Sequence, residues 1–85
     1  MKVFTTHQFD SDYDRLPQEI KERADKKLAL FMSDLRHPSL RAKKMEGYPS
    51  IWEGRISRNY RFTFQIEKDT ALLRRIGTHD ILKTP

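Results

Sequence analysis

The alternation of hydrophobic and polar residues predicts a strand followed by two helices at the start of the chain. Residues 3–9 mix β-branched, aromatic and polar side chains, which is typical of a strand. Asp10 and the two residues after it are favourable helix caps, so we expect a short helix over residues 11–16. Pro17 then stands where a proline belongs in the first turn of a second helix.

The second helix has the clearest periodicity in the chain. Its apolar residues recur at the 3.6-residue period and form one stripe: Ile20, Ala24, Leu28, Phe31, Met32 and Leu35. Leu30 falls off this stripe, so we expect it at the surface, where it could touch a partner. Pro38 ends the helix and biases His37 away from helical geometry. Residues 39–50 follow as a basic loop that is long for so small a domain, and such loops are often functional.

Three strand-like segments complete the chain, at residues 51–56, 60–66 and 71–77. The order of strand, two helices and a three-stranded meander predicts an α+β fold. In that fold the two N-terminal helices pack on one face of a four-stranded, mainly antiparallel sheet. With 85 residues, the chain is expected to form a single domain over residues 1–85.

Matching the apolar faces of the first two meander strands fixes how they pair. Gly54 then lies opposite Phe62, and residues 57–59 form a three-residue loop in which Asn59 can supply a left-handed conformation.

The same register places Arg55 directly opposite Arg61 on the other face of the sheet. Like charges paired across two strands repel each other, so the arrangement gains nothing structural unless an anion binds between them. Phosphate is an obvious candidate because guanidinium groups bind it bidentately. The alternative is that Glu53 or a helix carboxylate neutralises the pair.

The third meander strand carries two further arginines, Arg74 and Arg75. Neighbouring residues on a strand point to opposite faces, so we expect one of them to join Arg55 and Arg61 and the other to reach an edge. The sequence leaves open which one joins. His79 follows this strand and is expected at the margin of the sheet, near the arginines.

Charge favours a polyanionic partner. The chain has 17 Lys and Arg against 12 Asp and Glu, a net charge of +5. Residues 36–61 alone hold seven basic and two acidic residues, which accounts for the whole excess. Such a segment is typical of proteins that bind nucleic acid or an acidic protein. The alternative is a solvated face that only keeps the protein in solution.

Other site types are excluded or not indicated. The chain has no cysteine, which excludes disulfides, thiolate zinc sites and a cysteine nucleophile. Its three histidines are scattered, so we expect no metal and no cofactor. No apolar run approaches the roughly 20 residues that span a bilayer, and the chain start turns polar too soon for a signal peptide. We therefore expect a cytoplasmic protein without a membrane partner.

Three stretches of the chain resemble the RelE/ParE superfamily of toxins, and their order and spacing agree over nearly the whole length. They are His37-Pro38-Ser39-Leu40-Arg41, the segment from Trp52-Glu53-Gly54-Arg55-Ile56 through Asn59-Tyr60-Arg61-Phe62, and Arg75-Ile76-Gly77-Thr78-His79-Asp80. The terminal Gly-Thr-His is most similar to the YafQ/RelE branch, which consists of ribosome-dependent RNases (mRNA interferases).

The resemblance implies a toxin of a type II toxin–antitoxin system that cleaves mRNA on the ribosome, inhibits translation, needs no metal and is held inactive by a cognate acidic antitoxin. By position, His37 matches a general base, Arg61 a phosphate-binding arginine and His79 a general acid. Histidine suits both proton-transfer roles because it titrates near neutral pH. The cations expected to bind RNA or its phosphates are Arg41, Lys43, Lys44, Arg55, Arg58 and Arg75.

Two departures from the family pattern leave other functions open. Some members end in a catalytic tyrosine, which the tail Ile81-Leu82-Lys83-Thr84-Pro85 lacks, and Arg55 stands where the YafQ-like branch has histidine. The alternatives are a non-enzymatic gyrase inhibitor of the ParE type and a degenerate toxin that only binds its antitoxin. Trp52 and Tyr60 are predicted in the core, with a stacking platform for a nucleobase as the alternative for Trp52.

Overall fold

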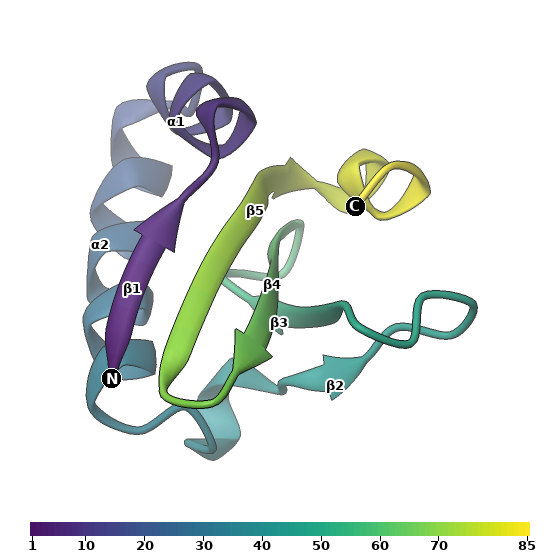
Figure 1. Ribbon diagram of the computed structural model, residues 1–85. Coiled ribbons are helices and arrows are strands. Elements are labelled where there is room, and N and C mark those ends of the chain that lie inside the picture. Colours follow the sequence, from purple (N-terminus) through teal and green to yellow (C-terminus); the bar gives the residue numbers. More distant parts are fainter.

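A mixed five-stranded sheet, in the order β1-β5-β4-β3-β2, organises the computed structural model, which describes residues 1–85 (Figure 1). The elements in chain order are β1 (Lys2–Thr5), α1 (His7–Asp14), α2 (Gln18–Ser33), the 3₁₀ helix η1 (Pro38–Leu40), β2 (Lys43–Lys44), β3 (Trp52–Arg55), β4 (Tyr60–Glu67), β5 (Thr70–Thr78) and the 3₁₀ helix η2 (His79–Lys83). β1 pairs parallel with β5, and the other pairs are antiparallel. The α+β class is confirmed.

The sheet has five strands instead of the expected four. The additional strand is β2, two residues from the segment expected to be a loop, which pairs Lys43 with Glu53 and Lys44 with Trp52. The residues there are polar and do not alternate with apolar ones, so the sequence does not predict a strand. An edge strand of two residues needs only a neighbouring strand with free backbone groups.

The first strand is shorter and the first helix begins earlier than expected. β1 ends at Thr5 because the Thr6 hydroxyl caps α1, accepting a hydrogen bond from the amide of Phe9 at 3.0 Å. The same hydroxyl donates to the carbonyl of Arg74 at 2.8 Å, which ties the start of α1 to β5. The cap therefore moves the helix start from residue 11 to His7.

α2 covers the sheet with the predicted apolar stripe, with three corrections at its C-terminal end. The helix ends at Ser33, before the expected stop at Pro38, so Leu35 lies beyond it. Phe31 is fully buried and meets the rings of Phe62 and Phe64 edge-on, at centroid distances of 5.5 and 4.8 Å. Met32, expected on the stripe, is 57% exposed, whereas Leu30 is half-buried against the core. Phe31 points at the sheet, and its neighbours Leu30 and Met32 lie about 100° to either side of it around the helix axis. The side that carries Leu30 contacts the core, and the side that carries Met32 faces solvent.

The predicted register of the first hairpin is confirmed. β3 and β4 pair Gly54 with Phe62 and Arg55 with Arg61. Gly54 is required by packing, since a Cβ there would overlap the Phe62 ring. The left-handed conformation expected at Asn59 is absent: the non-glycine residues with positive φ are Arg41 and Lys68.

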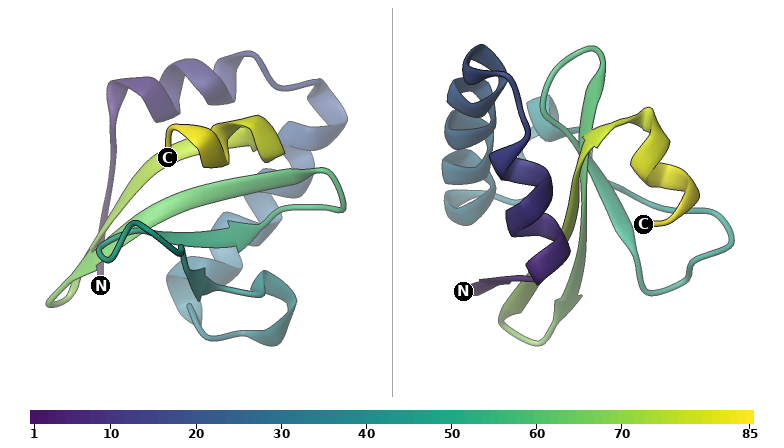
Figure 2. Two further views of the ribbon diagram at one scale, coloured as in Figure 1. Left: turned by 90° about the vertical axis from the view of Figure 1, so that its right-hand side faces the viewer. Right: turned by 90° about the horizontal axis from the view of Figure 1, so that it is seen from above.

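The two faces of the sheet are covered differently. Figure 2 shows α1 and α2 on one side and the C-terminal η2 on the other. η2 lies over β4 and β5, where Ile81 is buried and the fully buried Thr63 donates its hydroxyl to the backbone oxygen of Pro85 at 3.1 Å. The face without long helices is therefore open only toward β3 and β2. No helix has the length and apolar character needed to cross a membrane.

Candidate functional site

The open part of the sheet holds a cationic hollow of about 290 Å³ that no hydrophobic residue lines. We call it the arginine hollow. Its lining consists of four basic residues, one acidic residue and a glycine: Arg41, Lys43, Arg55, Arg61, Glu53 and Gly54. Arg55 and Arg61 come from facing positions on β3 and β4, and Lys43 comes from β2 opposite Glu53. The opposed arginines predicted from the register thus lie at one surface site.

No ion pair within the protein neutralises the basic residues of this hollow. Ion pairs within 4.0 Å involve only Asp12 and Asp80 as acids, so Glu53 forms none with the arginines beside it. Burial, followed by the charges of Arg55 and Arg41, lowers the pKa of Arg61 from its ordinary value, while Glu53 acts in the opposite direction. Such a cluster favours an anion between the arginines over neutralisation by Glu53.

The loop between β3 and β4 orients Arg61. Its Nη1 donates to the carbonyl oxygens of Ser57 at 2.7 Å, Tyr60 at 2.9 Å and Arg58 at 3.1 Å. The Nε–H and Nη2 groups make no hydrogen bond within the protein, which leaves a fork of donors for an oxyanion.

Arg41 reaches the hollow from a left-handed backbone conformation. It caps η1 with φ 48° and ψ 41°, which is uncommon for a residue with a side chain. Arg41 also lines a second and larger hollow of about 500 Å³, so the two hollows share this residue.

His37 lines this second hollow. Its Nδ1 accepts a hydrogen bond from the amide of Ser39 at 3.2 Å and lies 2.9 Å from the Ser39 hydroxyl. An Nδ1 that accepts from an N–H carries no proton, so in the neutral ring the proton is on Nε2. The basic nitrogen of His37 is therefore engaged locally in this geometry.

His79 lies in a third, shallow hollow at the end of β5. It is exposed and shares the hollow with Arg58 and neighbouring polar residues. It follows Gly77, the residue of β5 that pairs with Arg61, by two positions. His37, Arg61 and His79 thus line three hollows and not one. They are linked by Arg41, which lines the first two, and by Arg58, whose carbonyl accepts from Arg61.

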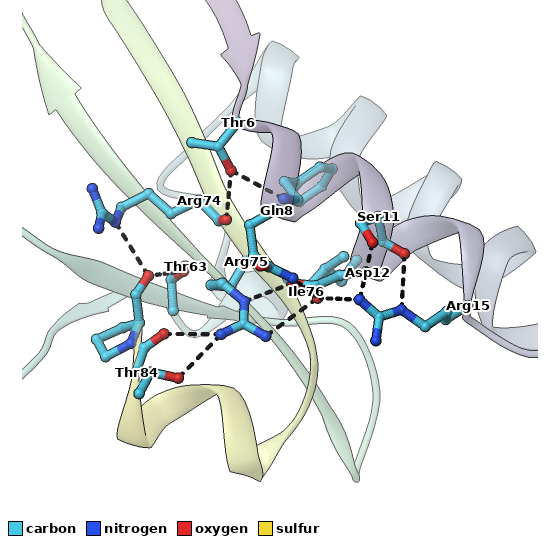
Figure 3. Close-up of polar contacts among 12 residues, drawn as sticks. Thr6, Gln8, Ser11, Asp12, Arg15, Thr63, Arg74, Arg75, Ile76 and Thr84 are labelled. Atoms are coloured by element: carbon cyan, nitrogen blue, oxygen red, sulfur yellow. Dashed lines mark hydrogen bonds and ion pairs between the residues drawn. The ribbon is translucent and has the colours of Figure 1, made fainter.

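Arg74 and Arg75 both reach the C-terminal segment, and neither lines the arginine hollow (Figure 3). Arg74 donates to the backbone oxygen of Pro85 and to Gln65, whereas Arg75 donates to Asp12 and to Thr84. The expected alternation fails because a bulge interrupts the pairing of β4 with β5 at Arg74, and alternation does not hold across a bulge.

The partner of Arg75 is the buried Asp12 of α1, which the sequence had marked only as a helix cap. Its carboxylate accepts from Arg75 Nε at 2.8 Å and from the backbone amide of Ile76 at 3.2 Å. No local pattern reveals this contact, because its partners lie more than 60 residues apart. The guanidinium of Arg75, expected to bind RNA, is therefore occupied within the fold.

The lysines of β2 lie on different sides of the sheet edge. Lys43 lines the arginine hollow, while the Nζ of Lys44 lies 5.6 Å from the ring centroid of Trp52. Trp52 is half-buried, stacks on Phe64 at a centroid distance of 6.2 Å and lines the larger hollow. Trp52 is thus packed on the core, as expected, and part of its side chain remains accessible. No three His, Cys, Asp or Glu side chains lie close enough together to hold a metal ion.

The fold matches solved toxin structures at low sequence identity. YafQ from E. coli BL21(DE3) gives a TM-score of 0.80 at 10% identity over 95% of this chain and 96% of that one. A YoeB/ParE toxin from Agrobacterium tumefaciens gives 0.78 at 16% identity over 93% and 99%. The RelB–RelE antitoxin–toxin complex of Methanococcus jannaschii gives 0.73 at 21% over 96% of both chains.

No sequence model of a known protein family matches the chain. A search of curated proteins also finds no match. The chain nevertheless has the fold of the RelE, ParE and YafQ toxins, so the resemblance found in the sequence is confirmed at the level of fold.

Proposed function

We propose that this protein is the toxin of a type II toxin–antitoxin system, a metal-independent endoribonuclease that cleaves mRNA on the ribosome and so stops translation. The observation that carries the proposal is the hollow lined by Arg41, Arg55 and Arg61, whose charge the fold leaves without an ion-pair partner. A phosphodiester supplies the missing negative charge, and the fork of Arg61 fits its oxygens.

An extended polyanion suits the site better than a small anion. The three hollows that hold His37, Arg61 and His79 follow one another through Arg41 and Arg58, and cations line each of them. A single phosphate can occupy only one hollow, whereas an RNA strand carries a phosphate at every nucleotide and can contact them all. Lys43 and Lys44 add positive charge at the adjacent edge of the sheet.

In the proposed reaction, a general base removes the proton of a ribose 2′-hydroxyl, and this oxygen attacks the adjacent phosphorus. The bond from phosphorus to the 5′-oxygen breaks, and that oxygen takes a proton from a general acid. The products are a 2′,3′-cyclic phosphate and a 5′-hydroxyl. Arg61 and Arg55 stabilise the negative charge of the phosphorane, and His79 is the acid.

His37 is the proposed base, and its geometry sets a condition on that role. Its Nδ1 must release the Ser39 amide, or the ring must turn, before a basic nitrogen can face the 2′-hydroxyl. His37→Gln separates the roles, because glutamine can donate a hydrogen bond and cannot act as a base at neutral pH. We expect this variant to be as inactive as His37→Ala. Full activity of His37→Gln would limit His37 to hydrogen bonding.

The proposed regulator is an acidic antitoxin encoded beside the toxin. The net charge of +5 favours an acidic partner. Similar folds have been crystallised with antitoxins, namely M. jannaschii RelE with RelB and E. coli YafQ with DinJ.

Induced expression in bacteria tests the function. We expect growth to stop with a loss of protein synthesis and with mRNA cut inside coding regions, and we expect Arg61→Ala or His79→Ala to relieve the arrest. Lys26→Gln, on the exposed face of α2, is the matched charge control and should remain toxic. Arrest with intact transcripts and a DNA-damage response would instead identify a gyrase inhibitor. No arrest, with retained antitoxin binding, would identify a toxin that keeps only its binding surface.

A further inference from the structure

The larger hollow beside the arginine site has an apolar floor and a cationic rim. Five apolar residues line it, namely Leu35, Ala42, Trp52, Phe64 and Ile66, and the other lining residues are Arg36, His37, Pro38 and Arg41. No carboxylate is among them. At about 500 Å³, the hollow is roomy enough for a purine or pyrimidine ring.

Trp52 gives this hollow a stacking surface. Its ring is held by packing against Phe64, with 18° between the ring planes, and its side chain is only half-buried. Lys44 Nζ lies over the ring, 5.6 Å from its centroid, so a base that stacks on this surface displaces or joins a flexible lysine side chain. Rigid, partly exposed aromatic rings next to cations are the elements with which proteins hold unpaired nucleobases.

The position of Arg41 joins this hollow to the phosphate site. Because Arg41 lines both, a ligand that extends from one to the other passes this residue. A nucleotide places a flat ring next to a phosphate, whereas an acidic peptide brings carboxylates of a single charge each. The net positive charge of the adjoining hollow, which four cations and one acid line, favours the nucleic acid.

We propose that the hollow between Trp52 and the His37 loop is a nucleobase subsite, which holds one base of the RNA whose neighbouring phosphate lies on Arg41, Arg55 and Arg61. The inference rests on the proposed RNA-cleaving function and adds to it the position at which the enzyme reads or stacks a base. Arg41 contacts the phosphate between the two hollows, and Trp52 is the surface on which the base stacks.

The single tryptophan of the chain reports on this subsite directly. The probes are 2′-O-methyl RNA tetranucleotides, which cannot be cleaved, with an abasic residue at each position in turn. We expect the intact tetranucleotide to quench Trp52 fluorescence saturably. One abasic position should remove the quenching and weaken binding by about 10-fold, within the range for loss of one stacked base. Abasic residues elsewhere should change affinity by less than about 3-fold.

A variant that fills the hollow and leaves the arginines unchanged provides a second test. Ala42→Leu adds bulk to the floor, and we expect it to remove the quenching and the preference between intact and abasic probes, while cleavage weakens less than in Arg61→Ala. Lys26→Gln should match the wild type. A cooperative thermal unfolding transition is the check that each variant is folded. The abasic probes are used with the wild type, so that test does not depend on the folding of Ala42→Leu.

The outcomes separate the subsite from the function. RNA binding, measured by anisotropy of labelled probes, with equal affinity for all abasic positions and no quenching would overturn the subsite and leave the phosphate site intact. Absence of any RNA binding or cleavage would overturn both. Quenching by an acidic, leucine-containing peptide and by no RNA would assign the hollow to a protein partner and overturn the inference.

Discussion

Asp12 binds hydrogen-bond donors of β5 that lie beyond the end of its pairing with β1. β1 accompanies β5 only as far as Leu73, and beyond it the carboxylate of Asp12 accepts the amide of Ile76 and the guanidinium of Arg75. The side chain of Asp12 is 7% exposed and that of Arg75 is 22% exposed, so this is a largely buried ion pair. Removing one partner of such a pair leaves the other charge without compensation.

We expect Asp12→Asn to lower the free energy of unfolding by about 2–4 kcal/mol, because the amide keeps the shape and loses the charge that Arg75 requires. Urea denaturation measures the loss. Asp14→Asn, at an exposed position on the same helix, should change stability by less than about 0.5 kcal/mol. Equal stability of the two variants would show that the Asp12 contacts contribute nothing net.

The same residue predicts how stability depends on pH. Burial alone raises the pKa of Asp12, but hydrogen bonds from Arg75, Gln8 and the Ile76 amide outweigh it and hold the pKa below the ordinary 3.8. A carboxyl with a lowered pKa in the folded state stabilises the fold above its unfolded pKa, and this contribution is lost as pH falls through the folded pKa. Below about pH 4 the wild type should therefore lose stability more steeply than Asp12→Asn, and parallel curves would refute this.

Arg55 represents the opposite kind of residue, one whose presence costs stability. Because it faces Arg61 across two strands, we expect Arg55→Gln to raise the free energy of unfolding by about 0.3–1 kcal/mol. The same change should weaken binding of non-cleavable RNA by about 10-fold, since one phosphate contact is lost. Lys26→Gln, the charge control, should change neither. A less stable Arg55→Gln with unchanged RNA affinity would mean that Arg55 is structural.

At the scale of elements, the β3–β4 hairpin carries the site, and its register depends on close packing. The ring of Phe62 lies where a Cβ of Gly54 would stand, so Gly54→Ala should push the strands apart and cost about 1–3 kcal/mol. Gly47→Ala is a useful contrast, because Gly47 has open space around it and only a positive φ of 82° to maintain, which costs about 1 kcal/mol. Similar small losses for both, measured by urea denaturation, would contradict tight packing at the hairpin.

The elements also show what local sequence determines. The pairing of Arg55 with Arg61 could be predicted because alternation in β3 and β4 admits one register that buries Phe62 and Phe64. β2 could not be predicted, since its two lysines pair with β3 only because β3 has a free edge. The placement of Arg74 and Arg75 could not be predicted either, because it depends on a bulge and on the distant Asp12.

At the scale of the molecule, the cations collect where the sheet is left open. η2 closes the β4–β5 side and leaves Arg41, Lys43, Arg55 and Arg61 around one hollow. Binding of non-cleavable RNA should therefore weaken with salt, with a slope of log affinity against log salt of about −2 to −3, as expected for three or four neutralised phosphates on a single strand. A slope near zero would exclude the cationic face as the binding surface.

The histidines set the limit of what the sequence could predict about chemistry. Resemblance assigned proton transfer to His37 and His79, but the fold places them in two hollows that Arg61 does not line, and the basic nitrogen of His37 faces Ser39. Which nitrogen a histidine presents depends on its hydrogen-bond partner in the folded chain. Sequence pattern predicts the residue type at a position and leaves that orientation undetermined.

Cleavage of mRNA on programmed ribosomes, with the ends of the fragments mapped, tests the phosphate site of Arg61 most directly. We expect the wild type to produce fragments with 2′,3′-cyclic phosphate and 5′-hydroxyl ends, Arg61→Gln to be slower by about 100-fold, as for loss of one oxyanion donor, and Lys26→Gln to match the wild type. Cleavage by Arg61→Gln at the wild-type rate, or intact mRNA with the folded wild-type protein, would contradict the assignment of this hollow as a nuclease centre.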